Sequence, residues 1–527
     1  MAWHSWYCSP KSSRTLFLAI VSRYYPPAEL SKMFFASAAF AGSLLIAAAR
    51  GADLTVPLAS GEEVRGTINA TSPHVRQFLG IPFAEPPVSR LRFQPPVKYA
   101  AKGAGTVIDA NAFAPSCMQP LTTPESDAKD VYHVYMPGFL PGSPNQSEDC
   151  LYLNVYAPLE PNAPKLPVFV WIAGGGFSSN GANVPYQVPD PWVERTQGHV
   201  VVTINYRLNF FGYPNAAAQS TNTEGLIVGF RWRISVEWVR DNIAAFGGDS
   251  DRIVLMGQSA GAWSVNYFGY AYPEDPIIKG LIADSGGSTV FAAADDEHKG
   301  FSAVAANAGC GGLEDAAAEM TCMQAVDSKK LQKVFADTKG FMFGPVVDNL
   351  TVFADPKDRA RNGLVAKLPA IMGVNSREGS AFAPWTAEEG VKETDMIAGS
   401  KVIVCPTVEE MQNRVENGLT TYRYFYSGNF SNVTPAPWLG ATHSSELPLI
   451  FGTHHQYNHN STEFEWNVSH AMQDLWLAFG SNPDAAPRTD SFSWPKYDPA
   501  ADTVASFAGA DGVVVRLDGH SIDDICA

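Results

Sequence analysis

The residues best suited to chemistry are a serine set between two glycines, in Gly257-Gln258-Ser259-Ala260-Gly261. An apolar run at 252–256 precedes this pentapeptide and predicts a buried strand, and residues 262–268 can begin a helix. A G-x-S-x-G sequence between a strand and a helix is typical of a nucleophile elbow, a sharp turn that exposes the serine hydroxyl. The alternative is an ordinary strand-to-helix turn, since a pentapeptide of this kind also arises by chance.

A serine hydroxyl becomes a nucleophile only with a base, an acid that orients the base, and donors for the oxyanion. Glu378 and His443 follow Ser259 in the order serine, acid, histidine that α/β hydrolases use. Each has a simpler interpretation, because a lone histidine is often structural and Glu378 could be a solvated loop carboxylate. The order alone therefore only permits a triad.

The run Gly174-Gly175-Gly176 directly follows a predicted buried strand. Without side chains, the N–H groups of Gly175 and Gly176 could approach a substrate and form an oxyanion hole together with the N–H of Ala260. A glycine-rich turn is the alternative. A phosphate-binding loop is disfavoured, because no Lys-Ser or Lys-Thr follows.

The elements that must position these residues alternate between strands and helices. Continuous apolar runs at 165–173 and 199–206 are typical of strands covered on both faces, and further strands are predicted at 279–283 and 369–374. Helical spacing is found at 232–246 and 467–480. This order predicts an α/β fold with a mostly parallel sheet, whose sites gather at the carboxyl ends of the strands.

Residues 118–149 are loop-like, yet they contain several aromatic and aliphatic side chains. A loop of this length is either a flap over a functional site or an Ω-loop packed by its own side chains. Both interpretations stay open at this point.

The start of the chain has the features of a targeting segment. Residues 33–51 have a short positive region, an apolar stretch and small residues at the end, as in a secretory signal peptide, and residues 1–32 are interpreted as an over-extended start. A membrane anchor with a cytoplasmic tail is the alternative, although the apolar run is short for a span. We therefore expect a leader over 1–51, a single domain over 52–527, and secretion.

Composition and cysteine content agree with this location. The net charge of −16 disfavours nucleic acid and anionic membranes as partners. Beyond the leader the cysteines are even in number, as a disulfide framework requires, but their pairing stays open. N-x-S/T sequons, which are candidate glycan sites, lie at Asn69, Asn145, Asn349, Asn429, Asn432, Asn460 and Asn467. No cofactor is predicted, and no metal either, since His454, His455 and His459 lie in a polar segment rich in sequons.

From about residue 60 to its end, the chain resembles the type-B carboxylesterase/lipase family, which includes cholinesterases and fungal lipases. The resemblance lies in ordered motifs at 80–87 with 91–93, 148–155, 205–208, 242–249, 344–348 and 494–497. It implies an α/β-hydrolase fold, with a large and mostly parallel central sheet flanked by helices and a small antiparallel sheet near the N-terminus.

The resemblance also assigns roles to residues. It implies Ser259 as nucleophile, Glu378 as acid and His443 as base of a carboxylic-ester hydrolase that works through an acyl-enzyme. It places the oxyanion hole on the N–H groups of Gly175, Gly176 and Ala260. It implies the disulfides Cys117–Cys150, Cys310–Cys322 and Cys405–Cys526, the first of which would close the 118–149 loop, the lid of lipases in this family.

Three departures from the family pattern bear on the substrate. Ala173 replaces a histidine or aromatic residue, Gln258 replaces a common glutamate, and the 118–149 loop lacks the tryptophan that holds the choline cation. The first departure opens the pocket wall, and the other two disfavour choline esters, while a small-molecule ester and a lipid ester both remain open. The segment 225–234 is also longer than the family pattern. A catalytically silent adhesion protein on this scaffold is the rival, disfavoured because the serine and the histidine are present; the sequence does not predict the oligomeric state.

Overall fold

The computed structural model describes residues 54–120, 124–140, 145–219, 233–291, 295, 297–509 and 512–527. Residues Leu54–Ala527 form one of the two compact units into which the chain divides. The predicted leader and nearly all of the 225–234 segment lie outside the described residues. Within the described residues, no helix is both long enough and apolar enough to cross a membrane.

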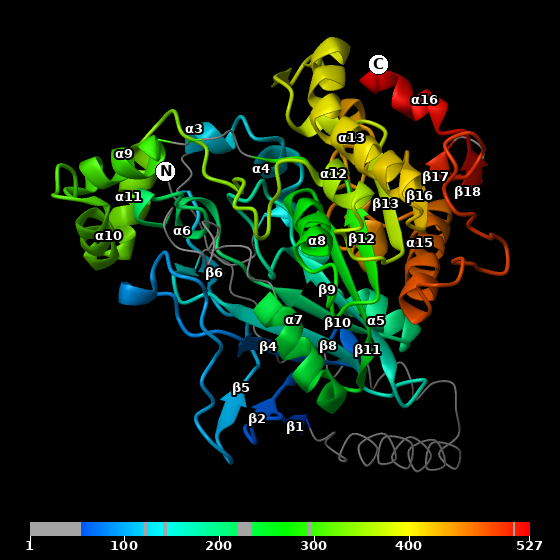
Figure 1. Ribbon diagram of the computed structural model, residues 1–527. Coiled ribbons are helices and arrows are strands. Elements are labelled where there is room, and N and C mark those ends of the chain that lie inside the picture. The colour runs from blue at the N-terminus through cyan, green and yellow to red at the C-terminus, as the bar shows by residue number, and fades with distance from the viewer. Residues whose placement is uncertain are drawn as a thin grey trace, which may run out of the picture. The chain divides into compact units, whose positions relative to one another are not determined.

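The central sheet has eleven strands, in the order β18-β17-β16-β13-β12-β11-β9-β10-β8-β4-β3 (Figure 1). In chain order these are β3 (Thr67–Asn69), β4 (Ser72–Pro82), β8 (Tyr152–Pro158), β9 (Leu166–Ile172), β10 (Val200–Ile204), β11 (Gly248–Gln258), β12 (Gly280–Asp284), β13 (Ala370–Asn375), β16 (Thr421–Tyr426), β17 (Val504–Gly509) and β18 (Gly512–Leu517). The strands from β10 to β17 in the sheet order run parallel, and the pairings beyond them are antiparallel. The predicted, mostly parallel α/β sheet is confirmed.

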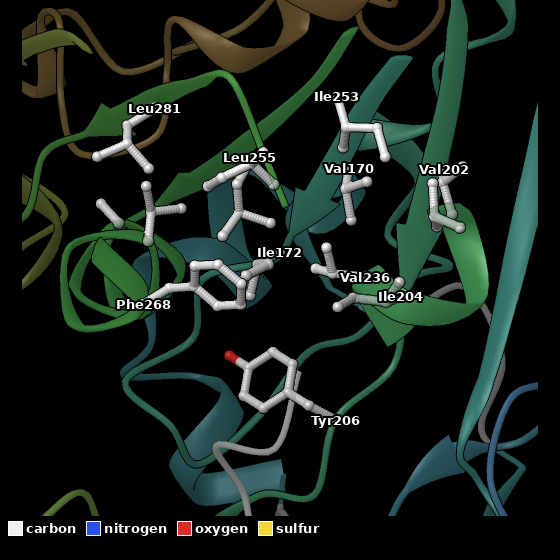
Figure 2. Close-up of a cluster of buried hydrophobic side chains, with 14 of the residues drawn as sticks. Val170, Ile172, Val202, Ile204, Tyr206, Val236, Ile253, Leu255, Phe268 and Leu281 are labelled. Carbon is white, nitrogen blue, oxygen red and sulfur yellow. The ribbon is translucent and has the colours of Figure 1, made fainter. Parts of the chain in front are cut away.

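The parallel strands are apolar throughout because both faces of the sheet are covered. Along β9, Val170 and Ile172 point to one face, whereas Phe169 and Trp171 belong to the core of the other. Figure 2 shows the first core, in which side chains of β9, β10 and β11 meet Phe268 of one helix and Val236 of another. Burial on both sides, rather than alternation, therefore gives these strands their sequence pattern.

Two helical layers cover the sheet. One contains α7 (Arg233–Asn242), α8 (Ala260–Ala271), α12 (Pro356–Arg361) and α13 (Glu393–Glu416), and the other contains α5 (Asp190–Thr196), α14 (Leu447–Phe451) and α15 (Glu463–Ser481). A third group of helices contains α9 (Lys299–Ala308), α10 (Ala316–Ala325) and α11 (Ser328–Asp337), which lie together in Figure 1. Their apolar side chains form a further core with Phe93, Phe210 and Phe211.

Shorter helices complete the described part of the chain. The α-helices are α3 (Pro124–Asp127), α4 (Val131–Tyr135), α6 (Asn209–Gly212) and α16 (His520–Asp523). The 3₁₀ helices are η1 (Ser89–Leu91), η2 (Pro137–Phe139), η3 (Pro185–Gln187), η4 (Ala217–Gln219), η5 (Ile243–Phe246), η6 (Glu378–Ala381), η7 (Pro437–Leu439) and η8 (Asp524–Cys526).

The small N-terminal sheet is mixed, so the expectation of an antiparallel sheet is wrong in one pairing. It contains β1 (Thr55–Pro57), β2 (Glu63–Arg65) and β5 (Val107–Asp109); β1–β2 is antiparallel and β2–β5 is parallel. The parallel pairing arises because β5 joins β2 only after the chain has passed through β3 and β4 of the main sheet. Two further pairs are β6 (Ser116–Cys117) with β7 (Gln146–Ser147), and β14 (Trp385–Thr386) with β15 (Gly390–Val391).

Disulfides join Cys117 to Cys150, Cys310 to Cys322 and Cys405 to Cys526, which are the pairings that the family resemblance implied. The first ties together the two ends of the 118–149 loop. The third links α13 to the C-terminal end of the chain, across a sequence separation of 121 residues. Cross-links over such long loops restrict the unfolded chain strongly.

One predicted glycan site does not fit the fold. Asn432 is buried, and its amide Nδ2 donates hydrogen bonds to the His454 carbonyl, to Ser461 Oγ and to Glu465 Oε1. A glycan on that nitrogen would break this network and has no exit to solvent, so the prediction at Asn432 is wrong. The other candidate asparagines are exposed.

Candidate active site

Ser259 lies at the junction of β11 and α8, where the chain turns sharply. Its φ of 55° and ψ of −125° are unusual for a residue with a side chain. Close approach explains the flanking glycines, because a Cβ at Gly261 would lie 2.0 Å from the Ile172 carbonyl oxygen, and one at Gly257 would lie 2.5 Å from the backbone of Gly261. The local sequence thus builds the strained turn that the G-x-S-x-G pattern predicts.

Glu378 and His443 are brought together from different parts of the chain. Glu378 follows β13 and is fully buried, and its Oε2 accepts a hydrogen bond from His443 Nδ1 at 2.5 Å. Its Oε1 accepts from Ser285 Oγ at 2.6 Å and from the Asn375 N–H at 2.7 Å. These donors fix the carboxylate, which in turn orients the imidazole so that Nε2 carries the lone pair.

The other imidazole nitrogen has an unexpected partner. His443 Nε2 lies 3.0 Å from the amide Nε2 of Gln258, and within the described residues no hydrogen bond joins Ser259 Oγ to His443. All three side chains nevertheless line the same cleft. Ser259 and His443 therefore line one cleft, and the amide N–H of Gln258 faces the lone pair on Nε2 of His443.

The glycine run after β9 passes directly beside the serine. A Cβ on Gly174 would lie 3.0 Å from Ser259 Cβ, and Gly175 and Gly176 have positive φ values of 118° and 59°. In the described part of the chain, the N–H groups of Gly175, Gly176 and Ala260 donate to no other protein group. Ala260 opens α8, where the helix dipole favours negative charge. The three predicted donors are thus available next to Ser259.

Two buried carboxyls that sequence reasoning missed lie behind Glu378. Burial raises the pKa of Asp284 to about 8, and the charge of Glu378 adds to this rise. Burial, together with the charges of Glu378 and Asp284, also raises the pKa of Glu446. Asn375 Nδ2 links this group to the triad, since it donates to Glu446 Oε2 and to the Thr442 carbonyl.

A sequence signal for part of this group existed. Asp284 and Ser285 directly follow the predicted strand at 279–283, and β12 pairs with β11, the strand that ends at the elbow. Polar residues at the carboxyl end of that strand must lie near the serine. Asn375 carried the same signal, because it directly follows the predicted strand at 369–374 and β13 pairs with β12. The position of Glu446 carried no such signal, because it does not follow a predicted strand and its partner Asn375 lies 71 residues away.

The cleft above Ser259 has a volume of about 600 Å³. Its apolar wall includes the side chains Phe139, Leu140, Phe291, Phe382, Val402 and Ile403. Its polar part includes Ser126, Lys129, Asp130, Gln187 and Gln258. The ring of Phe382 is half exposed and lies 4.9 Å from the imidazole of His443. Such a cleft accepts a molecule with an apolar part and a polar part.

The described residues 124–140 of the 118–149 loop contribute to the lining of this cleft and are called the flap below. The Tyr132 hydroxyl donates to the His443 carbonyl oxygen at 3.2 Å, and Trp385 Nε1 donates to the Lys129 carbonyl oxygen at 3.0 Å. Tyr135 also makes edge contacts with the rings of Trp385 and Trp438. The flap is therefore held both by its own side chains and by residues that surround the site.

The histidines considered for a metal have other contacts. His454 is buried, and its Nδ1 lies 2.7 Å from Ser461 Oγ and 3.1 Å from Glu465 Oε1. His459 Nε2 pairs with Ser431 Oγ. Across the part of the chain that the structure describes, no three metal-ligating side chains converge on one point.

Comparison with known proteins gives consistent matches along the chain. A sequence profile of the carboxylesterase family matches residues 52–397 and 386–513. A chlorogenic acid esterase of Aspergillus niger is 44% identical over 90% of this chain and 94% of that protein. Secreted lipase 5 of Gibberella zeae is 39% identical, covering 80% of this chain and 84% of that protein. Lipase 4 of Diutina rugosa is 29% identical, over 84% and 89% respectively.

Proposed function

Since the chain belongs to the carboxylesterase family and is a carboxylic ester hydrolase, we propose that it is a secreted serine esterase that forms an acyl-enzyme on Ser259. One observation carries the proposal: the Glu378–His443 pair and the strained Ser259 turn meet at a single cleft. A silent adhesion protein would have no need for this arrangement.

The geometry supports the following sequence of steps. Ser259 Oγ attacks the ester carbonyl while His443 Nε2 takes its proton, and Glu378 stabilises the imidazolium through its bond to Nδ1. The N–H groups of Gly175, Gly176 and Ala260 bind the oxyanion. His443 then gives the proton to the leaving alcohol. In the second half, the same histidine activates a water that releases the acid and restores Ser259.

We propose a small ester with an aromatic or short acyl group as the substrate. Phe291 and Phe382 offer apolar surface beside Ser259, and the polar groups of Lys129 and Asp130 lie in the same cleft. The match to the relative named chlorogenic acid esterase covers nearly the full length of both proteins, which supports this class.

A lipase acting on triacylglycerols or sterol esters is the second candidate. The observation that favours it is the flap, because Tyr132, Phe139 and Leu140 of this loop line the cleft, so their movement would expose apolar surface. Two relatives named as lipases support it as well.

Labelling of the active serine tests the mechanism. A fluorophosphonate should label the purified enzyme once, and Ser259→Ala should lose both the label and at least about a thousandfold of its p-nitrophenyl butyrate hydrolysis. Ser302→Ala, a change at an exposed serine on α9, is the matched control and should keep full activity. Hydrolysis that survives in Ser259→Ala would refute the assignment.

A series of esters of increasing acyl length, measured below and above their solubility, separates the two substrate classes. A jump in rate at the lipid interface would favour the lipase, whereas saturation below solubility with aromatic esters would favour the small-molecule esterase.

Secretion is tested separately, by expression of the whole chain and N-terminal sequencing of the protein in the medium. The disulfides and the secreted relative support that location.

A further inference from the structure

The side chain of Gln258 is held in a fixed place between the end of β11 and the base. It is buried, with 1% of its surface exposed, and its Nε2 lies 3.0 Å from His443 Nε2. On the other side, its Oε1 lies close to Gly174, where a Cβ would approach it to 2.6 Å. The missing side chain at Gly174 therefore leaves room for the amide to reach the imidazole.

The direction of this hydrogen bond follows from the rest of the network. Glu378 accepts from His443 Nδ1, so the neutral imidazole carries its hydrogen on Nδ1 and a lone pair on Nε2. Of the two polar atoms of the Gln258 amide, only Nε2 carries hydrogens that it can donate to that lone pair. If His443 gained a second proton, two N–H groups would face each other and the bond would be lost. With the amide in this orientation, the contact therefore exists only while the base is unprotonated.

We propose that Gln258 is a positioning residue that stabilises the unprotonated base and so keeps the enzyme active at lower pH than a carboxylate at this position would. The proposal rests on the proposed triad. A hydrogen bond to the neutral form of a group disfavours its charged form, and a neighbouring carboxylate does the opposite. During acylation, the hydroxyl of Ser259 takes the place of Gln258 as the donor to His443 Nε2.

Other charged or titratable groups lie in the cleft or in the buried group behind His443, and they stay the same when Gln258 is replaced. They are Glu378 at Nδ1, Asp284 and Glu446 in the buried group, Tyr132, Lys129 and Asp130 on the flap, and Tyr424 beside Asp284. A difference between variants therefore reports the contact at Nε2.

The test is the dependence of kcat/KM for p-nitrophenyl butyrate on pH, on its acid side, in three proteins. Gln258→Leu keeps the approximate size of the side chain but cannot donate, so its acid limb should move to higher pH than that of the native enzyme. Gln258→Glu places a carboxylate against Nε2, and its acid limb should move to higher pH by about one unit or more. At a pH below both acid limbs, kcat/KM relative to its own maximum should then be about tenfold lower in Gln258→Glu than in the native enzyme.

Gln187 offers a matched control. It lines the same cleft and is buried, but its Oε1 accepts from Trp171 Nε1 at 3.1 Å and it makes no hydrogen bond to His443. Gln187→Glu adds the same charge without touching the base, so its acid limb should stay close to that of the native enzyme. An equal shift in Gln187→Glu would overturn the proposal in favour of a general field effect.

Identical acid limbs in all active Gln258 variants would also overturn it, because a merely structural glutamine changes rates and leaves the limb in place. If Gln258→Leu does not fold, Gln258→Met removes the donor with a more flexible side chain. Failure of the triad itself would look different: Ser259→Ala would stay active, whatever the pH profiles of the Gln258 variants.

Discussion

Replacement of the buried carboxyl of Asp284 should stabilise the protein, and the gain should grow with pH. Asp284 ends β12 and is fully buried, and burial raises its pKa to about 8, with the charge of Glu378 adding to the rise. In the unfolded chain an aspartate has a pKa near 3.9. Asp284→Asn removes the ionisable group and keeps nearly the same size.

The two pKa values determine the sign and the size of the change in stability with pH. Below about pH 4 the carboxyl is protonated in both states, so it costs nothing. From there to about pH 8 the unfolded chain releases the proton while the folded protein retains it, and native stability falls by about 1.4 kcal/mol per pH unit. At pH 7 the native protein should have lost at most about 4 kcal/mol, a loss that Asp284→Asn does not suffer.

Urea unfolding followed by tryptophan fluorescence, with the disulfides intact, measures this difference at pH 5, 7 and 8. The midpoint of Asp284→Asn should rise above that of the native protein as the pH increases. Asp502→Asn, a change at an exposed aspartate, is the control and should show no such trend. A difference between Asp284→Asn and the native protein that is constant with pH, or that shrinks as pH rises, would refute the argument.

Two further changes test the scaffold. Loss of the Cys405–Cys526 link, in the double alanine variant, should lower the free energy of unfolding by up to about 5 kcal/mol, since the loop it closes spans 121 residues; equal urea midpoints with and without the link would contradict this. Gly261→Ala should prevent soluble expression, because its Cβ would lie 2.0 Å from a carbonyl oxygen at the end of β9, whereas Gly269→Ala on the same helix would meet only a leucine methyl at 3.5 Å and should fold.

The sequence predicts the parts of this protein that depend on local pattern. Buried parallel strands need apolar side chains on both faces, so they appear as uninterrupted runs. The turn at Ser259 needs glycine where the backbones of β9, β11 and α8 come closest, so it appears as a motif. In both cases the physical requirement acts on neighbours in the chain, and the sequence records it directly.

Features that depend on distant segments were missed or mispredicted. Ser285 reaches Glu378 across 93 residues, and Asn375 reaches Glu446 across 71, so no local pattern marks either contact. The burial of Asn432 is of the same kind, because a sequon defines only three residues and not what packs over them. The direction in which β5 joins β2 also depends on a path through the main sheet.

The hydrogen-bond donors around Glu378 explain why this residue, among the three buried acids near His443, is the one that orients the base. Glu378 receives hydrogen bonds from His443, Ser285 and the Asn375 N–H, whereas burial favours the protonated form of Asp284 and of Glu446. The parallel topology brings Asp284 and Glu378 together, because strand ends meet at one edge of the sheet, and Asn375 at the end of β13 holds Glu446 beside them. The donors then place the negative charge at Nδ1 of the imidazole. A neutral amide at Nε2 completes this arrangement, because a second carboxylate there would compete for the proton that the base must take from serine.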